Sequence, residues 1–166
     1  HAMSKPLVAY FSASGQTSQL AKTLATATRG DIFEIKPSQP YTSADLDWNN
    51  KHSHSTKEMD DINARPDIAE HLSHMDAYDV IFVGFPIWWY VAPRIINTFL
   101  EAYDFTGKTI IPFATSGGSG MGQTDNLLAK TCPEAHWLPG KRFSASASQG
   151  ELAAWADSLG IQTTLV

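Results

Sequence analysis

The stretch YFSASGQTSQLAKTLA, residues 10–25, joins an apolar run to a segment with helical spacing of its apolar residues. Between the two lie small and hydroxyl-bearing residues, among them Ser12, Ser14, Gly15 and Thr17. The start of a helix carries N–H groups without helical acceptors and a partial positive charge. Small residues at this position let an anion approach the backbone, so the stretch predicts a phosphate site that needs no cationic side chain.

Other phosphate and nucleophile motifs do not fit this stretch. It lacks the G-x-x-x-x-G-K-[ST] pattern of a Walker loop and the G-x-G-x-x-G pattern of a dinucleotide fold. A thiol phosphatase would need its cysteine here, whereas Cys132 is far along the chain. A plainer interpretation stays open, in which Ser14 or Thr17 only caps the helix.

Outside this stretch the chain alternates between strand-like and helix-like segments. Apolar runs predict strands at residues 6–11, 31–36, 78–86, 108–116 and, more weakly, 135–143. Helical patterns predict a first helix that contains residues 20–25 and runs to about residue 28, and further helices at 93–103, within 119–132 and at 151–159. Such alternation predicts an α/β fold, with a parallel sheet covered by helices on both faces. Pro112 inside the fourth strand is an objection to that assignment.

The length of 166 residues suits one domain. We take residues 1–3 as a cloning remnant and residues 4–166 as a single domain. Residues 37–65 are polar and form a segment too long for an ordinary connection. We expect an ordered insertion after the second strand, because the segment contains Trp48, a large apolar side chain that it can bury.

Composition excludes several classes of protein. A net charge of −5 argues against a nucleic-acid partner. A single cysteine provides no disulfide framework and suits a reducing, cytoplasmic location. The longest apolar run, residues 80–93, is too short for a membrane span. Pairs of histidines at 52 and 54 and at 71 and 74, the latter on an expected helix, lack a third ligand, so we expect no metal site.

Two further loops follow predicted strands and complete a possible site. GFPIWWY, residues 84–90, could hold a flat ring by stacking, although core packing of its aromatic residues is the alternative. TSGGSG, residues 115–120, could bring backbone N–H groups to polar ring edges. A phosphate loop, a flat-ring loop and a ring-edge loop together describe a site for flavin mononucleotide (FMN).

Over nearly its whole length the chain resembles the flavodoxin-like FMN protein family, a superfamily that includes short-chain flavodoxins and NAD(P)H quinone reductases. The resemblance lies in S-A-S-G-Q-T at residues 12–17 and in the two later loops, which are similar to the quinone-reductase branch. The insertion resembles a bacterial subgroup of the family. The resemblance implies a three-layer sandwich with a five-stranded parallel sheet in the order 2-1-3-4-5. It also implies FMN-binding residues, namely Ser12, Ser14, Gly15, Gln16, Thr17, Pro86, Ile87, Trp88, Trp89, Tyr90, Thr115, Ser116, Gly117 and Gly118, with Trp48 on a possible lid.

Three functions remain open at this point. The first is an FMN-dependent oxidoreductase that passes electrons or hydride from NAD(P)H or a reductase to a quinone or another flat acceptor. The second is a one-electron carrier between protein partners, and the third is an interaction module without flavin. Residues 86–90 contain no glycine for the backbone flip that the resemblance associates with one-electron carriers, and −5 is a modest charge for steering basic partners. Both features favour the oxidoreductase, in which the flavin carries the chemistry and no side chain is catalytic.

For isolated charged and thiol side chains we expect ordinary surface or core positions. We expect Lys22 to face solvent and Arg94 to be exposed, although Arg94 could instead meet a cofactor phosphate. We expect Cys132 to be a small buried or half-buried residue near a helix end.

Overall fold

The fold is given by a computed structural model, which describes residues 6–12, 15–37, 68–72, 75–86, 94–115, 124–138, 140–144 and 146–160. Its elements are, in chain order, β1 (Leu7–Tyr10), α1 (Gln16–Thr28), β2 (Asp31–Glu34), the 3-10 turn η1 (Met75–Ala77), β3 (Val80–Pro86), α3 (Arg94–Glu101), β4 (Thr109–Thr115), α4 (Thr124–Thr131), β5 (His136–Trp137), β6 (Lys141–Phe143) and α5 (Gln149–Ser158). Every strand and helix expected from the sequence has a counterpart in this order.

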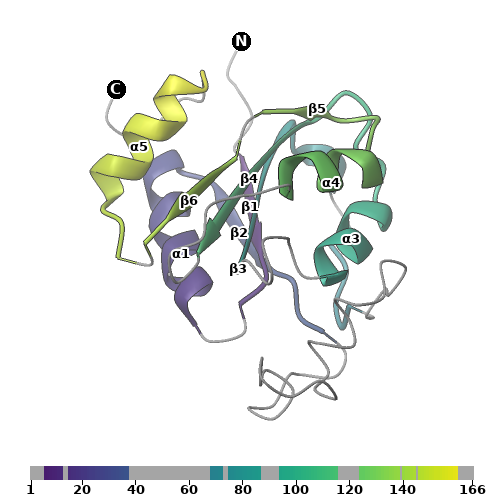
Figure 1. The fold of residues 1–166 in the computed structure, drawn as a ribbon, viewed down its shortest axis with the longest axis horizontal. Helices are drawn as coiled ribbons and strands as arrows, with labels where there is room; N and C mark the ends of the chain where they lie inside the picture. The colour runs from purple at the N-terminus through teal and green to yellow at the C-terminus, as the bar shows by residue number, and fades with distance from the viewer. Residues whose placement is uncertain are drawn as a thin grey trace.

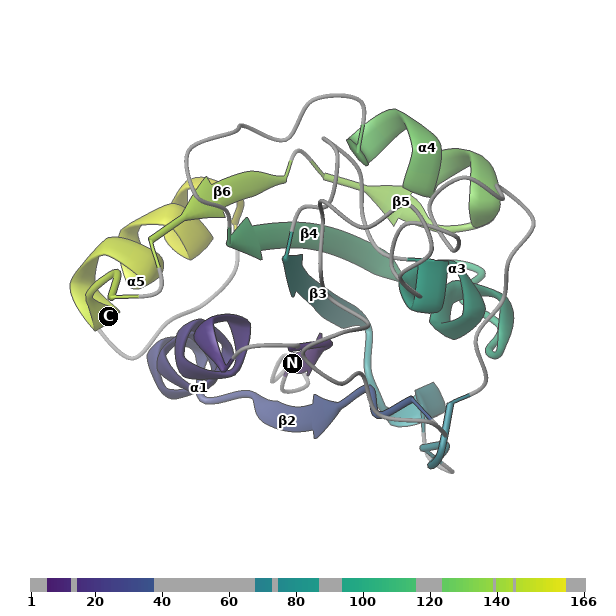
Figure 2. The ribbon, with the colours of Figure 1, turned by 60° about the horizontal axis from the view of Figure 1, so that its bottom comes forward.

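All strand pairs are parallel, and the sheet has the order β2-β1-β3-β4-β5, with β6 also beside β4. Helices α1 and α5 cover one face of the sheet, and α3 and α4 cover the other (Figures 1 and 2). The predicted three-layer α/β sandwich is therefore confirmed.

Two apolar cores separate these layers, one on each face of the sheet. Val8 and Phe82 pack with α1 and α5, whereas their neighbours Ala9, Ile81 and Val83 pack with α3 and α4. All five side chains are fully buried. Because both faces are covered, these strands are continuous apolar runs in the sequence, which is why they were easy to recognise.

Strand β1 lies between β2 and β3, so the chain changes direction across the sheet at the carboxyl ends of β1 and β3. The two strand ends are held together, since Tyr10 pairs with Gly84 and the Phe11 amide donates to the Gly84 carbonyl at 2.9 Å. Helix α1 leaves β1 on one side of the sheet, and the later elements extend the sheet on the other. In doubly wound folds this switch point is where ligands bind.

The predicted strand order is confirmed, with the expected fifth strand divided into two short strands, β5 and β6, that both pair with β4. Strand β5 pairs with residues 109–110 of β4 and β6 pairs with residues 113–115, so the pairing is interrupted beside residues 111–112 of β4. The His136 amide donates to the Lys108 carbonyl, and the Leu138 amide donates to the Ile110 carbonyl. Even-numbered residues along β4 therefore point their backbone N–H and C=O groups towards β5 and β6. Pro112 therefore has its missing N–H on this side, at the interruption.

The register of β4 therefore explains how a strand inside the sheet can contain Pro112. The residue stays in β4 and pairs with Val83 of β3 on the other side, where its lack of a donor costs no ladder bond.

The two ends of the long insertion after β2 lie side by side. Pro37 and Ile68 form an antiparallel bridge, and the Ala69 amide donates to the Lys36 carbonyl at 2.7 Å. The chain therefore leaves the sheet and returns to it at one point. Residues 38–67, with the expected lid residue Trp48, lie outside the described residues. Among the helices that the structure does describe, none is long and apolar enough to cross a membrane.

Candidate functional site

The loop between β1 and α1 makes a tight turn at the carboxyl end of β1. Gly15 is the N-cap of α1 with a φ of 90°, in the left-handed region that favours glycine. Its amide donates to the Ser12 hydroxyl oxygen at 3.0 Å. The ladder of α1 then begins with the Gln19 amide, which donates to the Gly15 carbonyl at 3.1 Å.

The start of α1 is open and has a positive electrostatic character. The amides of Gln16, Thr17 and Ser18 precede the first helical bond and have no acceptor within the helix. Gly15 offers no side-chain cap, and the first turn holds no acidic residue that would offset the helix dipole. A Cβ added at Gly15 would meet no described atom within 4 Å. The electrostatics of this helix end therefore favour an anion such as phosphate.

Thr17 does not cap the helix, because Gly15 is the N-cap and Thr17 lies within the first turn. Its Oγ1 is 2.7 Å from the Oγ1 of Thr115, which ends β4, and both side chains are buried, with exposed fractions of 1% and 2%. The capping interpretation is therefore wrong for Thr17, while Ser14 lies outside the described residues. Thr17 and Thr115 belong to separate predicted loops, and no local pattern in the sequence predicts this contact.

A glycine and an aromatic ring support this approach of α1 to β4. The ring of Phe113 lies over Gly84, where a Cβ would come within 2.2 Å of the ring. Any side chain at position 84 would displace this ring. Phe113, Phe82 and Leu20 belong to the core beneath α1, so the packing of this core fixes the height of the helix above the sheet.

The structure brings together part of the predicted site. Ser12 and Gly15 form the turn, Gln16 is exposed at the helix start, and Thr17 contacts Thr115. Pro86, at the end of β3, pairs in register with Thr115. The other predicted residues lie outside the described residues, namely Ser14, Ile87, Trp88, Trp89, Tyr90, Ser116, Gly117 and Gly118.

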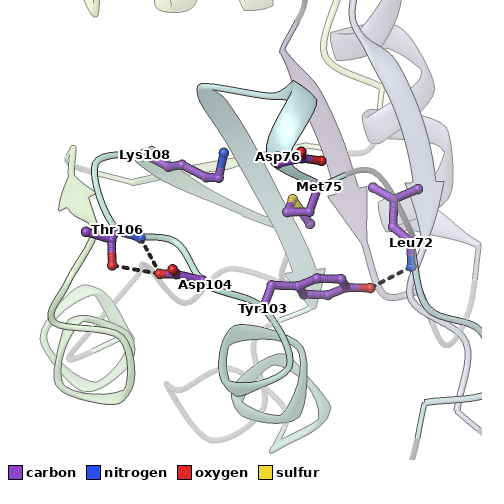
Figure 3. Close-up of a pocket in the computed structure, with 7 residues that line it drawn as sticks. All are labelled: Leu72, Met75, Asp76, Tyr103, Asp104, Thr106 and Lys108. Atoms are coloured by element: carbon purple, nitrogen blue, oxygen red, sulfur yellow. Dashed lines mark hydrogen bonds between the residues drawn. The ribbon is translucent and has the colours of Figure 1, made fainter.

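A pocket of about 390 Å³ lies at the opposite, amino-terminal end of the strands, between η1 and the connection from α3 to β4 (Figure 3). Several polar groups near it already have local partners. Tyr103 accepts from the Leu72 amide at 2.7 Å, and Lys108 donates to the Tyr78 carbonyl at 2.5 Å. Asp104 accepts from both the amide and the hydroxyl of Thr106, which lowers the pKa of its carboxyl group. These bonds organise the surrounding loops.

Isolated side chains mostly behave as expected. Lys22 is exposed, and Cys132 is fully buried, which raises the pKa of its thiol to about 12. Arg94 differs from its expectation of exposure, because its side chain is half-buried and its Nε is withdrawn from solvent. His71 is exposed but lies outside any helix, unlike its expectation. Among the described residues no three His, Cys, Asp or Glu side chains gather as for a metal.

Burial also perturbs one phenol near the beginning of β2. Tyr78 donates its hydroxyl to Asp31 at 2.7 Å, and burial together with this carboxylate raises the Tyr78 pKa to about 12. The bond joins the segment before β3 to the edge strand β2, so it serves the fold at the end of the sheet away from α1's start.

Comparisons with known proteins agree with this geometry. A family model described as flavodoxin matches residues 5–159. A crystal structure of a presumed flavoprotein from Bacteroides eggerthii is 49% identical, covers 96% of this chain and 99% of its own, and has a TM-score of 0.92. Another from Bacteroides uniformis is 46% identical, with coverages of 94% and 99% and a TM-score of 0.89.

A more distant structure shares the fold. A flavoprotein from Lactobacillus acidophilus, crystallised in complex with FMN, is 21% identical, with coverages of 92% and 99% and a TM-score of 0.71. A search of curated proteins gave no match.

Proposed function

Because the chain belongs to the flavodoxin family, we propose that it binds FMN without a covalent bond and acts as a redox protein. The observation that carries the proposal is the open start of α1, at the carboxyl end of β1 and at the switch point of the sheet. It is supported by the flavoprotein from Lactobacillus acidophilus, which has the same fold and was crystallised with FMN.

The phosphate group would lie at residues 12–17. The amides of Gln16, Thr17 and Ser18 would donate to its oxygens, because the helix provides them with no acceptor. The Ser12 oxygen accepts from Gly15, so its own hydrogen remains available for an anion. Ser14 would add a further hydroxyl. This set binds a charged group with backbone and hydroxyl donors instead of Lys or Arg.

The flat ring would lie over the ends of β3 and β4. Pro86 and Thr115 end these strands side by side, so the segments 87–90 and 116–118 begin at the same edge. Aromatic residues in the first segment would stack on the ring, and backbone groups of the second would meet its polar edge. FMN, when bound, supplies the electron and hydride chemistry, and the protein holds and orients it.

Within this role we favour two-electron chemistry, with hydride taken from NAD(P)H or a reductase and passed to a quinone or another flat acceptor. The support is the absence of glycine from residues 86–90 and the modest net charge. A one-electron carrier between protein partners is the second candidate, and membership of the flavodoxin family favours it. Either role is compatible with the reducing cytoplasm that a single cysteine suggests.

Cofactor identity is tested by heat release from the purified protein and mass analysis of the freed compound. We expect FMN and no adenine-containing flavin, since the chain has no dinucleotide fingerprint. Titration of the apoprotein with FMN, riboflavin and FAD adds the affinities. Recovery of FAD as the tighter ligand would contradict the proposal.

The aromatic segment is tested by replacing Trp88 and Trp89 with alanine. Stacking contributes about 0.5–1.5 kcal/mol beyond area burial, so we expect weaker FMN binding and brighter flavin fluorescence. Unchanged affinity and quenching would assign these residues to the core.

The redox role is tested by stepwise photoreduction of the loaded protein. Two-electron chemistry predicts a direct change from the oxidised to the fully reduced spectrum, with turnover of quinones in the presence of NAD(P)H. Strong long-wavelength absorbance at half reduction, without such turnover, would favour the electron carrier.

A further inference from the structure

The hydroxyl pair of Thr17 and Thr115 joins two parts of the site that are far apart in the sequence. Their Oγ1 atoms are 2.7 Å apart, within the usual range for an O–H···O bond, although 98 residues separate them. Thr17 belongs to the first turn of α1, and Thr115 is the last residue of β4. This contact is a direct link from the phosphate loop to the loop expected at the ring edge.

The position of Thr115 would suit an apolar residue equally well. Ile111 and Phe113 precede it on the face of β4 that α1 covers, and both are fully buried in that core. Alternation along a strand places Thr115 on the same face, and its exposed fraction is only 2%. Valine has nearly the same shape, so the hydroxyl itself calls for an explanation.

The number of hydroxyl hydrogens in the pair explains why a hydroxyl is present at position 115. Two hydroxyls carry two hydrogens, and the bond between Thr17 and Thr115 uses one of them. If Thr115 donates to Thr17, the hydrogen of Thr17 remains for an acceptor outside the pair. Thr17 lies between Gln16 and Ser18, whose amides open towards the proposed phosphate position. An anion at that position is the acceptor that would favour this direction of the bond.

We propose that Thr115 is a positioning residue for the phosphate site, donating to Thr17 so that the Thr17 hydroxyl donates to the phosphate of FMN. The inference rests on the proposed function and extends it to a residue at the end of β4. A donor that itself receives a hydrogen bond is polarised and held in one orientation, which strengthens its bond to an anion.

The test compares FMN with riboflavin, which has the same ring but no phosphate. In Thr115→Val the Thr17 hydroxyl loses its inward donor while the shape is kept. We expect FMN affinity to fall about tenfold, as for loss of about 1.4 kcal/mol, and riboflavin affinity to stay within about twofold. Thr115→Ser restores the donor and should bring FMN affinity back to within about twofold of wild type.

A double-mutant cycle adds an independent measurement. Thr17→Val removes the hydroxyl through which Thr115 acts, so Thr115→Val should add little further loss of FMN affinity on that background. Thermal unfolding of each apoprotein checks that the variants fold, and an effect on folding alone would lower FMN and riboflavin affinity by the same factor.

The outcomes separate this inference from the proposed function. If the wild-type protein binds neither FMN nor riboflavin, the proposed function fails. If the wild type prefers FMN but Thr115→Val keeps the full preference over riboflavin, the positioning role is wrong and the FMN site stands. Equal losses for both ligands, or additive losses in the cycle, would also overturn the positioning role.

Discussion

Helices α1 and α5 pack side by side on the same face of the sheet, yet they begin in different ways (Figure 2). Helix α5 is capped by Ser148, whose oxygen accepts from the Glu151 amide at 3.1 Å, and Glu151 places a carboxyl group in the first turn. Helix α1 is capped by Gly15, with neither a side-chain cap nor an acid in its first turn.

The two helices differ in what accepts from the N–H groups of their first turns. Ser148 and Glu151 have the spacing of a capping box, which satisfies N–H groups and complements the helix dipole from within the chain. The start of α1 lacks both devices, so its N–H groups are available to an external anion. One helix start is therefore completed by its own sequence, and we propose that the other is completed by a ligand.

The largest expected effect comes from putting a charge at the open helix start. Gly15→Asp adds a carboxylate where the phosphate would lie and a side chain at a φ of 90°. We expect FMN affinity to fall about 100-fold, corresponding to about 2.8 kcal/mol. Fluorescence titration of the apoprotein measures it.

Gly15→Asn is the matched control, because it has the shape of aspartate and no charge. It should keep most of the affinity that Gly15→Asp loses, since a Cβ at Gly15 meets no described atom within 4 Å. Equal losses in the two variants would mean that backbone strain, and not the anion, dominates at this position.

The next largest effect is expected from placing an acidic residue in the first turn of α1, where α5 has Glu151. Gln16→Glu changes an exposed side chain at the first helical position with little change of shape. A carboxylate there should stabilise the apoprotein by about 0.3–1 kcal/mol through the helix dipole. The same carboxylate should weaken FMN binding about tenfold by repelling the phosphate. Thermal unfolding and FMN titration should thus move in opposite directions, and a parallel change would contradict the model of an anion site.

A smaller effect is expected from removing the cap of α5. Ser148→Ala leaves the Glu151 amide without its acceptor and should lower the free energy of unfolding by about 1 kcal/mol. Denaturant unfolding of the apoprotein measures this loss. FMN affinity should not change, because Ser148 is not among the residues of the proposed FMN site, and a change of more than about twofold would show that the two helix starts are coupled.

The smallest effect is expected from Glu151→Gln. The substitution keeps the shape of the capping-box residue and removes its charge from the first turn of α5. We expect a loss of about 0.3–1 kcal/mol of unfolding free energy at low salt, and less at high salt because the dipole interaction is screened. A loss that is independent of salt would point to packing of this side chain instead of its charge.

The sequence also contains a local signal for the start of the last helix. The last helix was expected at residues 151–159, but it begins at Gln149 because Ser148 caps it. The S-x-x-E spacing of Ser148 and Glu151 is a recognised helix start and would have moved this boundary. The other boundaries differ by a few residues, because apolar runs do not say where hydrogen bonding to a neighbouring strand stops.

By itself the sequence determined the alternation of strands and helices and the parallel sheet, and it led to the prediction of an anion site at residues 12–17. Each of these depends on local properties: apolar runs for strands buried on both faces, helical spacing, and small hydroxyl-bearing residues at a strand-to-helix junction. Such signals lie within a few residues of one another, so they are visible along the chain.

Only the tertiary structure decided how distant residues meet. The side on which Pro112 lacks its N–H, and hence the division of the last strand into β5 and β6, follows from the register of β4. The contact of Thr17 with Thr115 depends on that register and on the height at which α1 crosses the sheet, which is set by the Phe113 ring above Gly84. Register and helix height result from the packing of the whole core, and no local pattern in the sequence records them.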